Sequence, residues 1–156
     1  MNEVLAALML WISANTAYDT TGMPLPEVIE MTPQELTAEY YTDAPQLMPA
    51  KGVDERIQAL YSIEEGPHGR VYILDADLVP GAADGDDAYD NPLFREMLLH
   101  ELVHHVQHVS GVADSYLCPA QGEVEAYRVG GVYLKQVHAD DPMPNRAFWA
   151  HMYSRC

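Results

Sequence analysis

Residues 98 to 107 constrain this chain more than any other stretch, because they contain the pattern H-E-x-x-H. The fixed members of the pattern are His100, Glu101 and His104. Residues four apart lie one turn above each other on the same face of an α-helix, so the two imidazoles can point at one metal ion. The glutamate beside the first histidine can then reach a water molecule on that metal. The motif therefore predicts a helix that binds Zn²⁺.

The flanking residues favour an amphipathic helix from about Pro92 to Ser110. At about 100° per residue, apolar side chains fall in one arc, and the two histidines and Glu101 fall in the opposite arc. Asn91 is a suitable N-cap, proline suits the first helical position, and Gly111 suits the position after the last turn. One side of this helix is expected to pack in a core, and the other side to carry polar groups.

A catalytic zinc site also needs a third protein ligand and a free position for water. The extended pattern with a third histidine is excluded, because Gln107 and Ser110 stand where it needs glycine and histidine. His108 continues the i, i+4 series but stands about 12 Å along the axis from the first histidine, which favours a role in packing or hydrogen bonding. Cys118 can be a ligand only if it is not in a disulfide. The best candidate lies on the last predicted long helix, residues 120 to 137.

Two acids near the start of that helix, Glu123 and Glu125, belong to the sequence Glu-Val-Glu-Ala-Tyr. Together with H-E-x-x-H, this stretch resembles the gluzincin class of zinc metallopeptidases, in which a glutamate within E-x-x-S/A-D on a second helix completes the site. The resemblance implies His100, His104 and Glu123 as the metal ligands. A helical wheel turns Glu125 about 160° away from Glu123, so the two acids cannot face one metal. Glu125 is then an ordinary acid near Arg128.

Tyr127 stands where the gluzincin class commonly has the aspartate. That aspartate orients a metal-bound histidine through a hydrogen bond, and a tyrosine can accept such a bond or donate one to an oxyanion. His105, His151 and Tyr153 are the other candidate oxyanion donors. Gly130 lies on the ligand-bearing face and is expected to let the two helices approach closely. Over most of its length the chain also resembles a group of small bacterial gluzincin-like proteins.

The patterns predict an α+β fold, and the resemblance implies that it is zincin-like, with a small antiparallel sheet packed on the active-site helix and on the second, ligand-bearing helix. Alternation over residues 57 to 63 and β-forming residues at 71 to 74 predict two strands joined by a hairpin. A weaker alternation predicts a short strand at 27 to 31, and the sequence from Thr32 to Glu35 predicts a short helix after it. By resemblance, residues 71 to 74 form the edge strand that pairs with an extended peptide substrate.

The chain of 156 residues is expected to form one domain, residues 1 to 156. Residues 1 to 17 contain an apolar run that is too short to cross a bilayer. The run resembles the core of a signal peptide but lacks the usual preceding positive charge, so a packed N-terminal helix is the preferred interpretation. Localisation stays open between the cytoplasm and export. Cys118 and Cys156 either form a disulfide that pins the C-terminal tail or remain two reduced thiols.

The acidic composition, with 24 acids, 8 bases and a formal net charge of −16, argues against nucleic acid or anionic membrane as partners. It favours solubility, or a preference for cationic substrates. The motifs predict a zinc-dependent hydrolase of peptide bonds, acting on a peptide or protein substrate, with Glu101 as general base. One alternative is a zinc-binding, catalytically inactive interaction module, and another is a pair of histidines with no metal. The oligomeric state is open.

Overall fold

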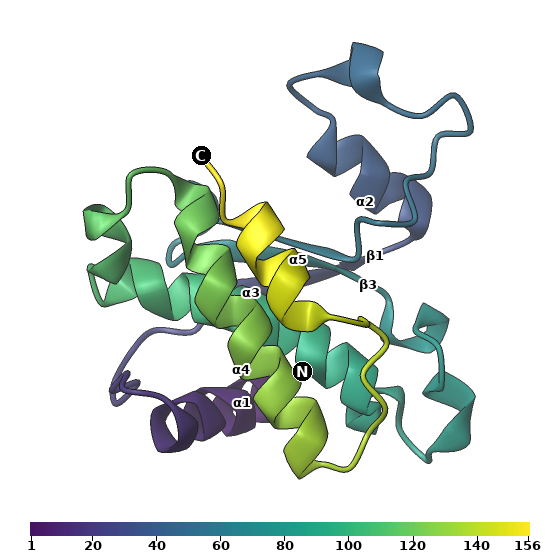
Figure 1. Cartoon of the computed structure of the whole chain (residues 1–156). Helices are drawn as coiled ribbons and strands as arrows, with labels where there is room; N and C mark the ends of the chain where they lie inside the picture. The colour runs from purple at the N-terminus through teal and green to yellow at the C-terminus, as the bar shows by residue number, and fades with distance from the viewer.

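A computed structural model describes all residues, 1–156, as five α-helices and a three-stranded sheet. The sheet contains β1 (Glu27–Met31), β2 (Ala59–Ser62) and β3 (Arg70–Leu74). Figure 1 shows α3 through the middle of the molecule, with α4 beside it, α1 below it and the sheet above it. The predicted α+β class is therefore confirmed. The helices are α1 (Asn2–Asn15), α2 (Pro33–Tyr40), α3 (Pro92–Val109), α4 (Glu123–Gln136) and α5 (Arg146–Tyr153).

The sheet is mixed, which corrects the prediction of an antiparallel sheet. Its strand order is β1-β3-β2, with β1 parallel to β3 and β2 antiparallel to β3. Parallel neighbours need a long crossover connection, and α2, the following loop and β2 together supply it between β1 and β3. The predicted hairpin of β2 and β3 and the predicted strand at residues 27 to 31 are confirmed.

The central strand is β3, so the expectation that residues 71 to 74 form a free edge is wrong. Val71 and Ile73 are fully buried, and β3 is paired on both of its sides. A run so rich in β-branched residues suits the middle of a sheet, where both neighbours and the core cover it. The free edges of the sheet belong to β1 and β2.

The hydrophobic core lies around the apolar side of α3, as the helical wheel predicted, except that Val109 is exposed and Met97, expected on the polar side, is buried in the core. The buried side chains of this side pack with those of β3, α4 and α1 in one cluster. The N-terminal segment forms α1, which is packed on the domain and buries Leu5, Leu8, Met9 and Ile12. From α3, the cluster contains Phe94, Met97, Leu98, Leu99, Leu102, Val103 and Val106.

The predicted ends of α3 are confirmed. The Asn91 side-chain oxygen accepts a hydrogen bond from the Leu93 amide at 2.9 Å, and its amide nitrogen donates to the Pro80 carbonyl at 3.0 Å. Pro92 is the first helical residue. Gly111 follows the last turn in the left-handed conformation, with φ at 76°, which glycine adopts without steric cost.

Replacing Asn91 with alanine is expected to lower the free energy of unfolding by about 1 kcal/mol, because the first turn of α3 loses its cap. Urea unfolding followed by circular dichroism measures the change. Asn91→Asp keeps the capping oxygen and loses only the donor to Pro80, so its loss should be smaller. Equal losses in both variants would show that the cap contributes nothing.

The C-terminal third of the chain differs most from expectation. The helix predicted over residues 120 to 137 begins later, because Pro119–Gly122 form a 3₁₀ turn and α4 starts at Glu123. The helix α5 was not predicted at all. It packs on α4, and a disulfide joins Cys118 to Cys156 just beyond it, with 5.8 Å between the two Cα atoms. The structure thus contains the disulfide, which excludes Cys118 as a metal ligand.

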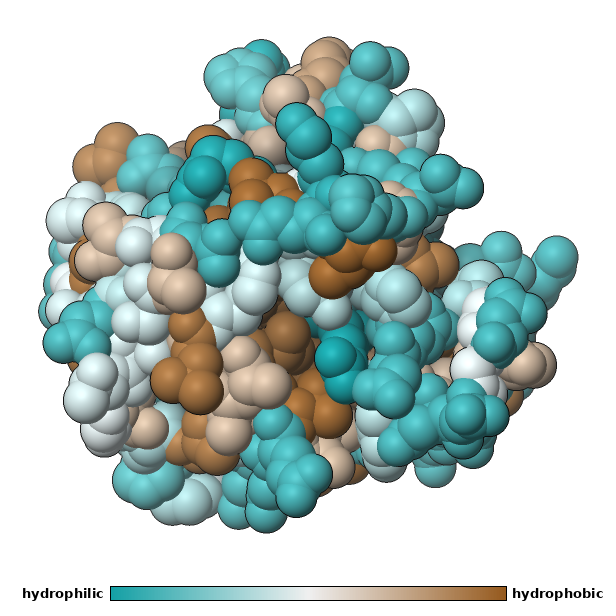
Figure 2. All heavy atoms as spheres, turned by 90° about the horizontal axis from the view of Figure 1, so that it is seen from below, coloured by the Kyte–Doolittle hydropathy of each residue, from teal (hydrophilic) through white to brown (hydrophobic).

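On the face seen in Figure 2, hydrophobic residues gather near the centre and hydrophilic residues surround them on most sides. None of the helices combines the length and apolar character that a membrane-spanning segment needs.

Candidate metal centre

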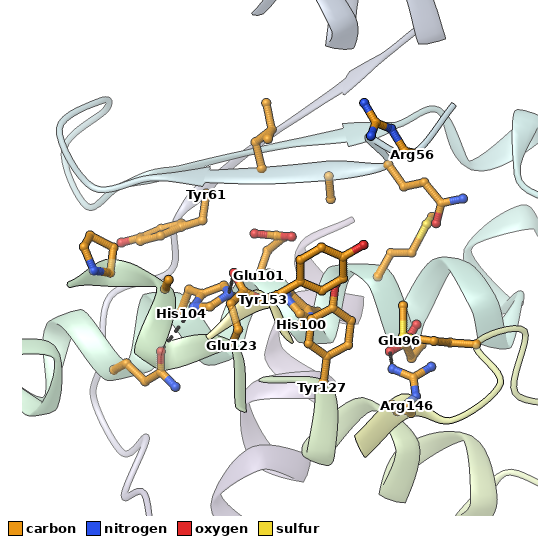
Figure 3. A pocket seen from close by; sticks show the side chains of 18 of the residues that line it. Arg56, Tyr61, Glu96, His100, Glu101, His104, Glu123, Tyr127, Arg146 and Tyr153 are labelled. Carbon is orange, nitrogen blue, oxygen red and sulfur yellow. Dashed lines mark hydrogen bonds and ion pairs between the residues drawn. The ribbon is translucent and has the colours of Figure 1, made fainter. Parts of the chain in front are cut away.

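Three side chains from α3 and α4 converge on one point. The ligand atoms of His100, His104 and Glu123 all lie within 4.8 Å of one another. His100 Nε2 is 3.1 Å from Glu123 Oε2 and 3.2 Å from His104 Nε2, and His104 Nε2 is 3.4 Å from Glu123 Oε1. Figure 3 shows the three side chains meeting in the middle of a cleft. The structure therefore brings together the three residues that the sequence selected as ligands.

These separations suit a single small cation. Nitrogen and oxygen ligands about 2.0–2.1 Å from a tetrahedral ion lie about 3.3–3.4 Å from one another. The observed pairs, at 3.1, 3.2 and 3.4 Å, are close to that spacing. His100, His104 and Glu123 can therefore bind a metal ion without large movement.

The orientation of His104 is set by Gln107. The Gln107 amide nitrogen donates to the Gly122 carbonyl at 3.1 Å, so its oxygen faces His104 Nδ1, also at 3.1 Å. With a metal bound, Nδ1 would carry the proton and Nε2 would offer its lone pair to the ion. Gly122 leaves room for this contact, because a Cβ there would lie 2.5 Å from the Gln107 oxygen.

The electrostatics of the cluster favour an ionised Glu123. Burial alone would raise its pKa, but hydrogen bonds with His100 and His104 lower the pKa of Glu123 to about 2. Its place in the first turn of α4 adds the favourable field of a helix N-terminus. Burial opposes a charge on His104, yet hydrogen bonding to Glu123 raises the pKa of His104. A strong anionic ligand thus stands opposite two imidazoles.

Glu101 lies beside the cluster and lines the same cleft. It is buried, and burial raises its pKa, against the opposing effect of His100 and His104. A carboxylate in such surroundings is a better proton acceptor than one in water. The structure thus places Glu101 next to the two histidines, and its role as a general base stays a prediction.

Two tyrosines form a wall beside His100. The ring of Tyr127 meets the His100 ring edge-on, with 4.7 Å between centroids, and Tyr153 stacks on Tyr127 at 5.7 Å. Both tyrosines line the cleft. Burial raises the pKa of Tyr127, so its phenol keeps the proton that a hydrogen-bond donor needs. Tyr127 and Tyr153 both stay candidates for the oxyanion donor.

The other two candidate donors lie outside the cleft. The His105 ring is fully buried between the Pro24 carbonyl, 2.8 Å from Nε2, and the Tyr61 hydroxyl, 3.2 Å from Nδ1. It points away because it is one residue beyond His104, a turn of about 100° around α3. His151 is exposed on α5 and does not line the cleft. Neither histidine is placed to contact a substrate bound at the cluster.

The cleft has a volume of about 870 Å³. One side is formed by β2 and the loop before it, and the other by the polar side of α3, the start of α4 and the end of α5. Because β2 is a free edge of the sheet, unpaired backbone groups run along the cleft. Tyr61 extends from this strand, and burial raises its pKa to about 12.

A buried ion pair closes one end of the cleft. Glu96 and Arg146 lie 2.7 Å apart, with about a tenth of each side chain exposed, and Arg146 also makes two 2.8 Å hydrogen bonds to Asp141. The pair rests on Gly130 and Gly131 of α4, where a Cβ would meet Glu96 or Arg146. Gly130 therefore allows the expected close approach of the two helices, and Glu96 is the group that occupies the space.

Comparison with known proteins adds a family. Residues 1–153 match the family model described as Domain of unknown function (DUF6647). The chain belongs to this family. No curated protein and no solved structure matches it.

In this DUF6647 domain, Gln107 and the Glu96–Arg146 pair line the cleft beside the cluster, and sequence reasoning missed them. Gln107 stands three residues after His104, on the same face of the helix, which is a usable signal for a residue that orients a ligand. Glu96 likewise stands four residues before His100. Its partner Arg146 belongs to α5, which has no sequence signal of comparable strength. Glu125 behaves as predicted, bonding Tyr18 and Arg128.

Proposed function

We propose that the protein is a zinc-dependent hydrolase that cleaves peptide bonds. The observation that carries the proposal is the convergence of His100, His104 and Glu123, beside Glu101, at the floor of an open cleft. Two imidazoles and one carboxylate are a ligand set of catalytic zinc sites, which leave a coordination position for water. Bound there, zinc would lower the pKa of its water molecule and polarise the substrate carbonyl.

Residues of the chain supply the remaining steps. The Glu101 carboxylate accepts the proton of the attacking water and passes it to the leaving amine. Tyr127 or Tyr153 donates a hydrogen bond to the oxyanion that develops on the carbonyl oxygen. The free edge of β2 offers backbone N–H and C=O groups to an extended peptide, which would add a strand to the sheet.

Replacing Glu123 with alanine is expected to abolish both stoichiometric zinc binding and peptide cleavage. Loss of a direct ligand should exceed the roughly 10–100-fold loss of affinity caused by removing a ligand's hydrogen-bond partner. Metal analysis after dialysis measures the zinc, and mass spectrometry of a mixed peptide library measures cleavage. Glu125→Ala is the matched control on the same helix, and it should retain both properties, because Glu125 contacts Tyr18 and Arg128 instead.

The same two measurements on the unaltered protein separate the rival functions. Stoichiometric zinc with cleavage of library peptides supports the hydrolase. Stoichiometric zinc with no cleavage of any peptide favours a zinc-binding interaction module. A protein that binds no zinc would contradict both.

A further inference from the structure

A row of aromatic rings leads from the metal ligands to the surface. The Tyr127 ring contacts His100, Tyr153 stacks on Tyr127 with the two planes 21° apart, and Trp149 stacks on Tyr153 at 5.8 Å and 24°. Figure 3 shows Tyr127 and Tyr153 beside His100 in the cleft. Trp149 and Tyr153 are one turn apart on α5, so this short helix presents both rings on one side.

The outer rings of this row are largely exposed to solvent and contribute little to the packing of α5. Half of Tyr153 and 38% of Trp149 are exposed to solvent, while Ala150 and Arg146 make the buried contacts of α5. Phe148, on the same helix, is 57% exposed. Large exposed apolar patches on soluble proteins mark interaction surfaces or ligand-binding grooves, and Tyr153 joins these rings to the cleft. The aromatic side of α5 is therefore available to bind a ligand and is not part of the hydrophobic core.

The helix that carries the rings is held at both ends. At its start, Arg146 is bound to Glu96 and Asp141. Just beyond its end, Cys156 is joined to Cys118, which itself lines the cleft. Because α5 is fixed at both ends, it loses little conformational freedom when a ligand packs against its aromatic rings.

The C-terminal segment that contains α5, residues 142 to 156, also differs in charge from the rest of the chain. All 24 acidic residues lie within residues 1 to 141, and none lies in residues 142 to 156. The helix α5 itself therefore carries aromatic rings and no acidic side chain, and the two acids that contact it, Glu96 and Asp141, are paired with Arg146. Its complement is a large apolar group, and a flat aromatic ring matches stacked tyrosines best.

We propose that Tyr153, with Tyr127 and Trp149, forms a specificity subsite for a large aromatic side chain of the peptide, next to the bond that is cleaved. The inference rests on the proposed hydrolase function. The position next to that bond is inferred from the contact between Tyr127 and His100, because a carbonyl held at the metal would lie close to that histidine. Each contact between two aromatic rings is expected to increase the binding affinity roughly two- to twelvefold.

The test uses pairs of peptides that differ only by phenylalanine or alanine beside the cleaved bond. The unaltered protein should favour phenylalanine by roughly tenfold in kcat/KM, mainly through KM. Tyr153→Ala should lose most of that preference, and Tyr153→Phe should retain it. Tyr40→Ala is the matched control, since Tyr40 is a similarly exposed tyrosine, 53%, on α2, and it should keep the full preference.

Binding to the zinc-loaded Glu101→Gln variant separates this inference from the hydrolase. That variant should bind the phenylalanine peptide about tenfold more tightly than the alanine peptide, and adding Tyr153→Ala should remove the difference. Selective binding without cleavage by the unaltered protein would overturn the hydrolase and keep the subsite. No selectivity, or full selectivity in Tyr153→Ala, would overturn the subsite. If Tyr153→Ala lowers the melting temperature, Trp149→Ala repeats the test on the outer ring.

Discussion

Glutamine in place of Glu101 is expected to leave zinc bound and to lower kcat/KM for peptide cleavage about a thousandfold, within the range of general acid–base effects. The amide has nearly the same shape as the carboxylate, so the buried position beside His100 and His104 stays filled. It cannot accept the proton of the attacking water or deliver it to the leaving amine. The three ligand atoms come from other residues, so the metal content should not change.

Two measurements on this variant decide the role of Glu101. Metal analysis should give the same zinc stoichiometry as the unaltered protein, and kinetics with a cleaved library peptide should give the loss in rate. Glu125→Gln removes an equal charge on α4, away from the cluster, and should change the rate by no more than about twofold. Undiminished cleavage by Glu101→Gln would require another general base, and loss of zinc would assign Glu101 a structural role.

The ligand set was accessible from sequence because helical periodicity is local. The spacing of His100 and His104 places both on one side of any helix, and the wheel shows that Glu123 and Glu125 cannot both face one metal. The choice of Glu123 as the third candidate came from the resemblance to the gluzincin motif. Gln107 and Glu96 lie on that same side of α3 and were within reach of the same argument. Arg146 was not, because its contact with Glu96 depends on where a helix 50 residues away in the chain is placed.

For the sheet as well, the local sequence predicted where the strands are but not their order, which depends on contacts between distant parts of the chain. Alternation located β1 and β2, and the β-forming residues located β3, but neither signal carries information on which strand lies in the middle. That order follows from the crossover through α2, which brings β3 between β1 and β2. The free edge in the cleft is consequently β2. The helix α5 has eight residues, too few to be stable alone, and distant contacts with α4, Glu96 and Cys118 hold it.

Alanine at Gly130 is expected to lower the free energy of unfolding by at least about 2 kcal/mol, although alanine is the better helix former by about 1 kcal/mol. The added Cβ would overlap the Glu96 Oε1 atom and lie 3.0 Å from its Cδ atom. Glu96 cannot swing away freely, because it is buried and bonded to Arg146. Overpacking costs about 1–3 kcal/mol, and breaking a buried ion pair costs about 3–5 kcal/mol.

The sign of this effect should reverse once Glu96 is gone. In a Glu96→Ala background, Gly130→Ala meets no carboxylate, and the helix preference of alanine should stabilise the protein by up to about 1 kcal/mol. Urea unfolding of the four proteins gives the coupling energy, expected to be at least about 2 kcal/mol. Equal losses in both backgrounds would show that Glu96 is not the source of the strain and would assign it to Arg146, whose Nη1 atom lies 3.1 Å from the Cβ position, or to α4 itself. A reversal would show that this helix carries glycine at position 130 in order to hold the ion pair at the end of the cleft.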